Sequence, residues 1–217
     1  MALPPPPPVR SSHSAVAGAG ALGAVVFQQS QFMVRRKIFK LLGGAFHVYD
    51  LQQQQVYAYS KMKAFKLKED IRLYTGEDMQ TELLTIKARQ IMDFGATYDV
   101  VDPRQGKVGA LRRKALKSFI RDEWMILDPH DREIGLIQED STGLAIIRRL
   151  VDFASMFLPQ KYVVTMQGMP VATFQQNFNP FVFKLVVDLS GDQGGMFDRR
   201  LALASSILMA AIEGKQS

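Results

Sequence analysis

The chain of 217 residues contains no cysteine, which excludes disulfide bonds and thiolate chemistry. Its three histidines do not form an HExxH zinc motif, and no GxSxG nucleophile elbow lies near them. The sequence also lacks a recognisable nucleic-acid-binding module, such as the aromatic stacking motif of RRM domains. These absences favour a non-enzymatic protein without a cofactor or a nucleic-acid partner.

The chain also lacks an apolar run long enough to cross a bilayer as a helix. The best candidate, residues 199–212 (RRLALASSILMAAI), would make a helix of about 21 Å, against roughly 30 Å for a bilayer core. Residues 201–212 leave no polar face, because even the gaps are Ala and Ser. We therefore expect the protein itself to surround this helix, with Asp198 as its N-cap and Gly214 as its C-terminal stop.

Residues 1–30 predict a disordered tail that is rich first in proline and then in glycine and alanine. The five prolines at residues 4–8 favour an extended polyproline II conformation, which either docks to an SH3-type or WW-type groove or acts as a spacer. A GxGxxG match within residues 15–27 lacks the preceding strand and the following acid of a dinucleotide site. It therefore does not indicate nucleotide binding.

From residue 31 onward, short apolar segments alternate with turns. Asp50, Thr75, Asp102 and Asp128 each follow such a segment, at intervals of 25, 27 and 26 residues, and a second strand follows each turn. Residues 144–158 instead carry apolar side chains at helical spacing, which predicts an amphipathic helix. The pattern gives about a dozen strands, and that number favours a closed barrel that can wrap the terminal helix.

Positive charge is concentrated in the first half of the predicted barrel. Residues 35–121 hold 18 Lys or Arg against 9 Asp or Glu, whereas residues 122–217 hold 8 against 12. This excess favours an anionic partner such as a phospholipid surface or a phosphoinositide head group. The candidate contact residues form two clusters: Lys61, Lys63, Lys66 and Lys68, and Arg112, Arg113, Lys114 and Lys117. The alternative is a solvated face whose lysines protect strand edges.

The succession of strand, acidic turn and strand, ending in residues 185–212 (LVVDLSGDQGGMFDRRLALASSILMAAI), resembles the LURP-one-related family of the Tubby C-terminal-like superfamily. Phospholipid scramblases belong to the same superfamily. The resemblance covers residues 31–217 and implies a mainly β protein. Its fold would be a twelve-stranded closed antiparallel barrel enclosing a hydrophobic C-terminal helix. Among the activities of the superfamily are phosphoinositide binding in Tubby proteins and calcium-dependent lipid scrambling in scramblases.

The resemblance to scramblases also makes Asp188, Asp192 and Asp198 weak calcium candidates, since scramblases are described with a calcium-binding segment before this helix. Compared with an EF-hand loop, the segment has Gln193 in place of the turn glycine and Arg199 in place of the bidentate glutamate. We therefore expect no metal site. The carboxylates would instead form a turn and a helix cap.

We predict a cytoplasmic, non-enzymatic barrel protein that contacts anionic phospholipid peripherally through its basic half. Two alternatives stay open at this stage. One is a scramblase-like membrane protein whose terminal helix inserts into the bilayer. The other is an interaction scaffold whose Pro-rich tail recruits a protein partner.

Overall fold

A computed structural model of the chain describes residues 25–39, 43–62, 70–89, 96–114, 123–140, 160–177 and 182–212. Most of the predicted tail lies outside this part of the chain, including all five consecutive prolines. The amphipathic helix predicted for residues 144–158 also lies outside it.

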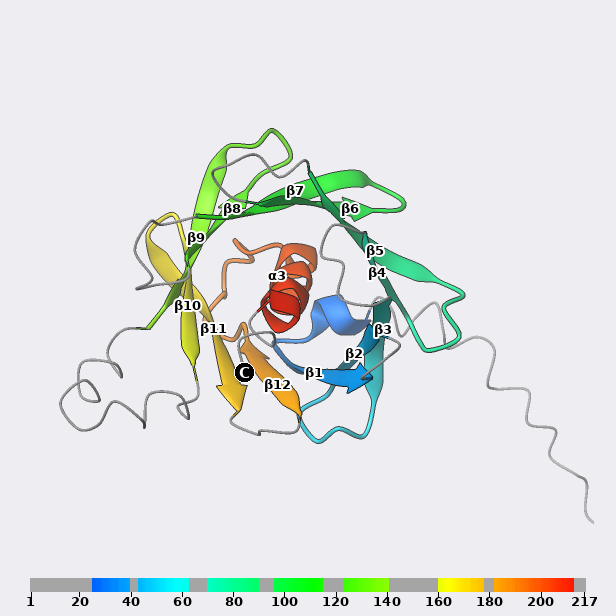
Figure 1. Ribbon diagram of the computed structural model, residues 1–217. Coiled ribbons are helices and arrows are strands. Elements are labelled where there is room, and N and C mark those ends of the chain that lie inside the picture. Colours follow the sequence, from blue (N-terminus) through cyan, green and yellow to red (C-terminus); the bar gives the residue numbers. More distant parts are fainter. Residues whose placement is uncertain are drawn as a thin grey trace, which may run out of the picture.

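Twelve strands form one closed antiparallel barrel around helix α3 (Figure 1). Each strand pairs with its neighbours in the sequence, and β1 closes the ring by pairing with β12. The elements in chain order are η1 (Val26–Gln28), β1 (Gln31–Phe39), β2 (Gly43–Tyr49), β3 (Val56–Met62), β4 (Ile71–Tyr74), β5 (Glu82–Ala88), β6 (Thr97–Asp102), β7 (Gly106–Arg113), β8 (Glu123–Leu127), β9 (Glu133–Glu139), β10 (Lys161–Met166), β11 (Met169–Asn177), β12 (Phe183–Asp188) and α3 (Arg199–Ile212). The predicted fold is confirmed.

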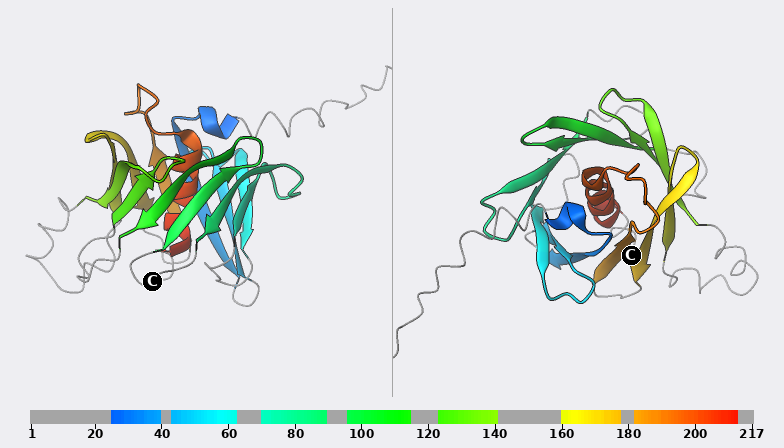
Figure 2. Two further views of the ribbon diagram at one scale, coloured as in Figure 1. Left: turned by 90° about the horizontal axis from the view of Figure 1, so that it is seen from above. Right: turned by 180° about the vertical axis from the view of Figure 1, so that it is seen from behind.

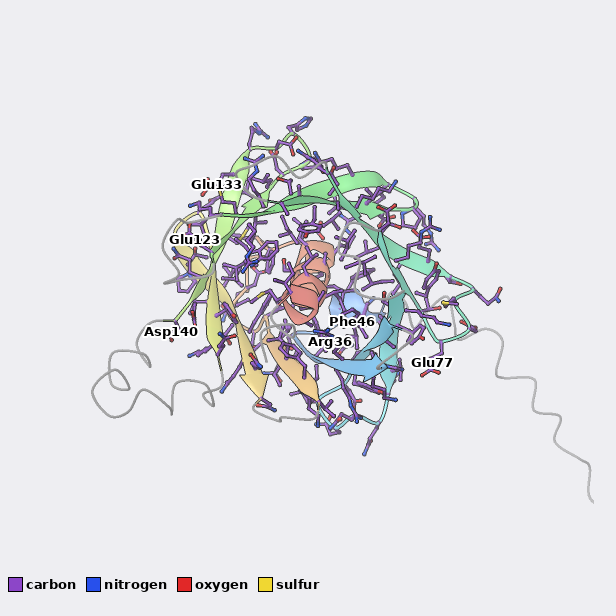
Figure 3. The ribbon with its side chains drawn as sticks, in the orientation of Figure 1. Arg36, Phe46, Glu77, Glu123, Glu133 and Asp140 are labelled. Atoms are coloured by element: carbon purple, nitrogen blue, oxygen red, sulfur yellow. The ribbon has the colours of Figure 1, made fainter. Side chains whose placement is uncertain are left out.

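Alternation along the strands separates the inside of the barrel from its outer surface. In β1, Phe32, Val34 and Arg36 are buried, whereas Lys37 is exposed. Successive side chains of a strand point to opposite faces, so the first three face the interior. Figure 3 shows Arg36 and Phe46 inside the ring of strands, near α3.

Aspartate side chains close several of the hairpin turns, as the repeat predicted. Asp102 Oδ1 accepts a hydrogen bond from the backbone N–H of Arg104 at 2.8 Å, and Asp128 Oδ1 accepts one from His130 at 2.8 Å. These Asx turns satisfy backbone donors that the strand ladder has released. Gly106, which follows the first of these turns, has a φ of +81°, a conformation that favours glycine.

Helix α3 is buried on all sides. Every residue from 201 to 212 is buried, including the two serines. Ser205 Oγ donates to the carbonyl of Leu201 at 2.6 Å, and Ser206 Oγ donates to that of Leu203 at 2.7 Å. Both hydroxyls are thereby satisfied within the helix, so α3 presents an almost wholly apolar surface to the barrel.

The two ends of α3 are held by charged side chains. Asp198 Oδ1 accepts a hydrogen bond from the backbone N–H of Arg200 at 2.8 Å, which confirms Asp198 as the N-cap. At the other end, Arg36 Nη1 donates to the carbonyl of Ala210 at 3.1 Å. A cation at this position interacts favourably with the negative end of the helix dipole, although burial lowers the pKa of Arg36.

The folded part of the chain begins before residue 31, where the domain was predicted to start. Val26 of η1 is 2% exposed and belongs to the hydrophobic core. The left view in Figure 2, which shows the barrel from the side, places η1 at the same end of the barrel as the segment that enters α3. Residues 25–30 therefore belong to the barrel and help to cover this end of it.

Leu203→Glu tests whether the barrel depends on its central helix. Leu203 is fully buried, and an unpaired buried charge costs several kcal/mol against a typical total stability of about 5–15 kcal/mol. We expect loss of the cooperative thermal transition followed by circular dichroism. Met169→Glu is the control, because Met169 is 51% exposed and its substitution should leave the transition unchanged. A normally folded Leu203→Glu variant would contradict the enclosed helix.

Arg36→Met tests the buried contact at the C-terminal end of α3. Methionine fills similar space but leaves the Ala210 carbonyl without this donor, so we expect a loss of about 1–3 kcal/mol in the free energy of unfolding. Urea denaturation measures the change. Lys37→Met, on the exposed side of the same strand, should shift it by less than about 0.5 kcal/mol.

Candidate functional site

The structure describes half of the cations that were predicted to contact anionic lipid. Lys61 lies on the outer face of β3 and is exposed. The others of its cluster, and one of the second, lie outside the described residues: Lys63, Lys66, Lys68 and Lys117.

In the second cluster, Arg112 and Lys114 already bind side chains of neighbouring strands. Arg112 Nε donates to Thr97 Oγ1 at 3.2 Å, and Lys114 forms an ion pair with Glu123. Arg113 is half-buried and stands opposite Trp124 in the pairing of β7 with β8. Arg112 and Lys114 therefore already have protein partners, which makes this cluster a weaker candidate for a ligand.

A second set of cations in the basic half is neutralised by a network on the outer face of β5 to β9. Arg89 Nη2 lies 2.5 Å from both Asp99 Oδ1 and Asp131 Oδ1, and Lys107 Nζ donates to Asp131 at 2.9 Å. The hydrogen bonds from Arg89 and then Lys107 lower the pKa of Asp131 to about 2. This side of the barrel is therefore rich in charge but close to balanced.

The opposite side carries cations that form no ion pair among the described residues, although the charge of Lys37 helps to lower the pKa of Glu77. The register places Lys184 of β12 beside Arg35 of β1, while Lys37 of β1 and Lys61 of β3 flank Ala45 of β2. All four cations belong to the outward-facing set of their strands, since each has a buried neighbour in sequence: Val34 and Arg36 beside Arg35, Arg36 before Lys37, Ser60 before Lys61, and Leu185 after Lys184. We call this group, Arg35, Lys37, Lys61 and Lys184, the basic face.

Two features adjoin the basic face. His47, the cross-strand neighbour of Arg35, is buried, and its Nε2 donates to Glu77 Oε1 at 2.6 Å. This hydrogen bond is the main reason why the pKa of Glu77 is lowered. His47 also contacts the ring of Tyr59 edge-on, with centroids 5.0 Å apart. Aromatic and imidazole groups therefore border the cations, while Glu77 remains largely exposed on its turn.

The calcium candidates bind groups of the protein. Asp188 accepts from the backbone N–H of Ser190 at 2.9 Å, and Asp192 accepts from that of Met196 at 2.8 Å. Asp198 caps α3, as described above. Across the ranges that the structure describes, no three His, Asp or Glu side chains gather in an arrangement that could hold a metal ion.

No described helix has the length and hydropathy needed to cross a membrane. Helix α3 comes closest in composition, but it is enclosed by the barrel rather than exposed on its surface (Figure 1).

A barrel of twelve antiparallel strands closed around a buried C-terminal helix has the architecture of the Tubby C-terminal-like superfamily. Comparison with families narrows this class: the sequence model described as LURP-one-related matches residues 56–210, more than half of the chain. The chain belongs to the LURP-one-related family. The search of curated proteins gave no match.

Asp131→Asn tests the balanced network through its pH dependence. The folded pKa of about 2 lies below the usual value of about 3.9, so the ionised carboxylate stabilises the fold above pH 4. That contribution is lost as the pH falls through about 2. We expect wild type to exceed Asp131→Asn in urea stability at neutral pH, with the difference shrinking toward pH 2. Asp70→Asn, at an exposed acid outside the network, should show no such trend.

Proposed function

We propose that this protein is a non-enzymatic cytoplasmic member of its family that binds anionic phospholipid surfaces through the basic face. One observation carries the proposal: four cations share the outer surface of three strands and form no ion pair among the described residues, although Lys37 lies near enough to Glu77 to lower its pKa. Elsewhere in the basic half, Arg89, Lys107 and Lys114 are already paired with acids. An anionic head group would supply the acceptors that this face lacks.

The expected strength of the contact is modest and depends on salt. Each Lys or Arg close to an anionic membrane contributes about 1 kcal/mol, so the four cations together contribute about 4 kcal/mol. The field falls off over a Debye length of roughly 8 Å at physiological ionic strength. Such a contact is peripheral and reversible, and it leaves α3 inside the barrel.

The double variant Lys37→Glu with Lys61→Glu tests the proposal. Both side chains are exposed, so the fold should survive while two attractive charges become repulsive. We expect flotation with phosphatidylcholine vesicles that contain phosphatidylserine to fall by at least tenfold relative to wild type. Wild-type binding itself should be lost at high salt.

The matched control is Lys87→Glu with Lys161→Glu, which changes the net charge equally at exposed sites on other strands. It should retain most of the binding. An equal loss in both double variants would reduce the effect to net charge and contradict a defined face. Wild-type binding that survives high salt would instead favour insertion of an apolar element, as in the scramblase-like alternative.

A further inference from the structure

A pocket of about 480 Å³ opens at the end of the barrel where α3 begins. Its walls come from η1, the β4–β5 and β6–β7 hairpin ends, and the segment that leads into α3. Figure 2 shows η1 and that segment at the same end of the barrel. The volume lies within the roughly 300–1,000 Å³ typical of small-molecule sites. This pocket is separate from the basic face on the outer wall.

Part of the lining is apolar. Phe27 of η1, Leu83 of β5 and Phe197 all contribute to it. Phe197 is 1% exposed and Leu83 is 9% exposed, so their positions are fixed by the core behind them. The pocket can therefore hold the hydrocarbon part of a ligand against a rigid surface.

The acids of the pocket are committed to protein groups. Asp102 accepts from the Arg104 backbone N–H at 2.8 Å and from Arg200 Nη1 at 3.2 Å. Asp198 accepts from Arg200 through both oxygens, with Nε at 3.0 Å and Nη2 at 2.7 Å. Glu82 accepts from the hydroxyl of Thr85. These carboxylates are thus poorly placed to bind a cationic ligand.

The cations of the pocket are not all committed. Arg200 is used by Asp102 and Asp198, but Arg199 and Arg104 retain donors. Among the described residues, Arg199 Nη1 is buried and has no hydrogen-bond partner, although Arg199 Nη2 lies 3.9 Å from Asp192 Oδ2. The guanidinium of Arg104 is exposed and has no acidic partner in the described part of the chain. A buried donor without an acceptor is costly, so the pocket favours a ligand that supplies oxygen acceptors.

We propose that this pocket binds a small amphipathic oxyanion, in which a carboxylate or phosphate meets Arg199 and Arg104 and an apolar body lies against Phe27, Leu83 and Phe197. The guanidinium groups supply charge-assisted hydrogen bonds, and their planar fork suits either acid group. The apolar wall distinguishes such a ligand from free inorganic phosphate. The site is independent of lipid contact through the basic face.

Isothermal titration of the full chain with decanoate, decyl phosphate, decanol and inorganic phosphate, each below its micelle concentration, tests this site. We expect at least one of the two amphipathic anions to bind about tenfold more tightly than decanol, because decanol lacks the charge-assisted contact. Stronger binding of decyl phosphate would indicate a phosphate-bearing ligand, and stronger binding of decanoate a carboxylate. Inorganic phosphate alone should bind at least tenfold more weakly than the better amphiphile.

Arg104→Gln and Arg199→Gln should each weaken binding of the better anion by about tenfold. Arg104 is exposed on a turn, so its variant keeps the test valid if Arg199→Gln fails to fold. Lys87→Gln removes one positive charge outside the pocket and should leave the affinity unchanged. The proposal is overturned if no probe binds, if decanol binds as tightly as the anions, or if Arg104→Gln and Lys87→Gln behave alike.

Discussion

The structure depends on the burial of one apolar helix inside a closed sheet, where residues 201–212 are all buried. The end groups of a helix have no partners within the helix, and where they are buried the protein must supply them. Asp198 caps the first turn from the chain itself, whereas Arg36 reaches the Ala210 carbonyl from β1. Arg36 belongs to β1, the strand that closes the ring with β12. Closure of the barrel therefore also positions the donor for the Ala210 carbonyl of α3.

Side chains alternate between the two faces of each strand, so the same strand can pack against α3 on its inner face and carry charge on its outer face. On β1, Val34 and Arg36 face α3, while Arg35 and Lys37 face outward. The outward side chains do not pack in the core, so these positions can carry charge without destabilising it. The balanced network around Arg89 and the unpaired basic face therefore coexist on the same barrel without affecting its interior.

Much of the fold could be predicted from local chemistry, because turns and helices are encoded by neighbouring residues. Asp102 and Asp128 close the turns that their spacing predicted, and Asp198 caps α3. The candidate site was harder to predict, because it depends on register between strands. Lys184 lies beside Arg35 only through the β1–β12 pairing, across most of the chain. Similarly, Lys114 pairs with Glu123 because β7 and β8 are neighbours in one particular register, and that register could not be read from the sequence.

The enclosed helix also bears on the two modes of membrane contact proposed for this protein. To insert α3 into a bilayer, the protein would have to withdraw a segment whose residues 201–212 are all buried, leaving the barrel hollow. The inward-facing apolar side chains of the barrel would lose the helix that covers them. Burial of one large apolar side chain contributes about 1.5–3 kcal/mol and several line the barrel, so the loss would approach the typical stability of about 5–15 kcal/mol. Contact through the basic face needs no rearrangement of the core. Of the two proposed modes, surface contact by an intact barrel therefore costs less free energy.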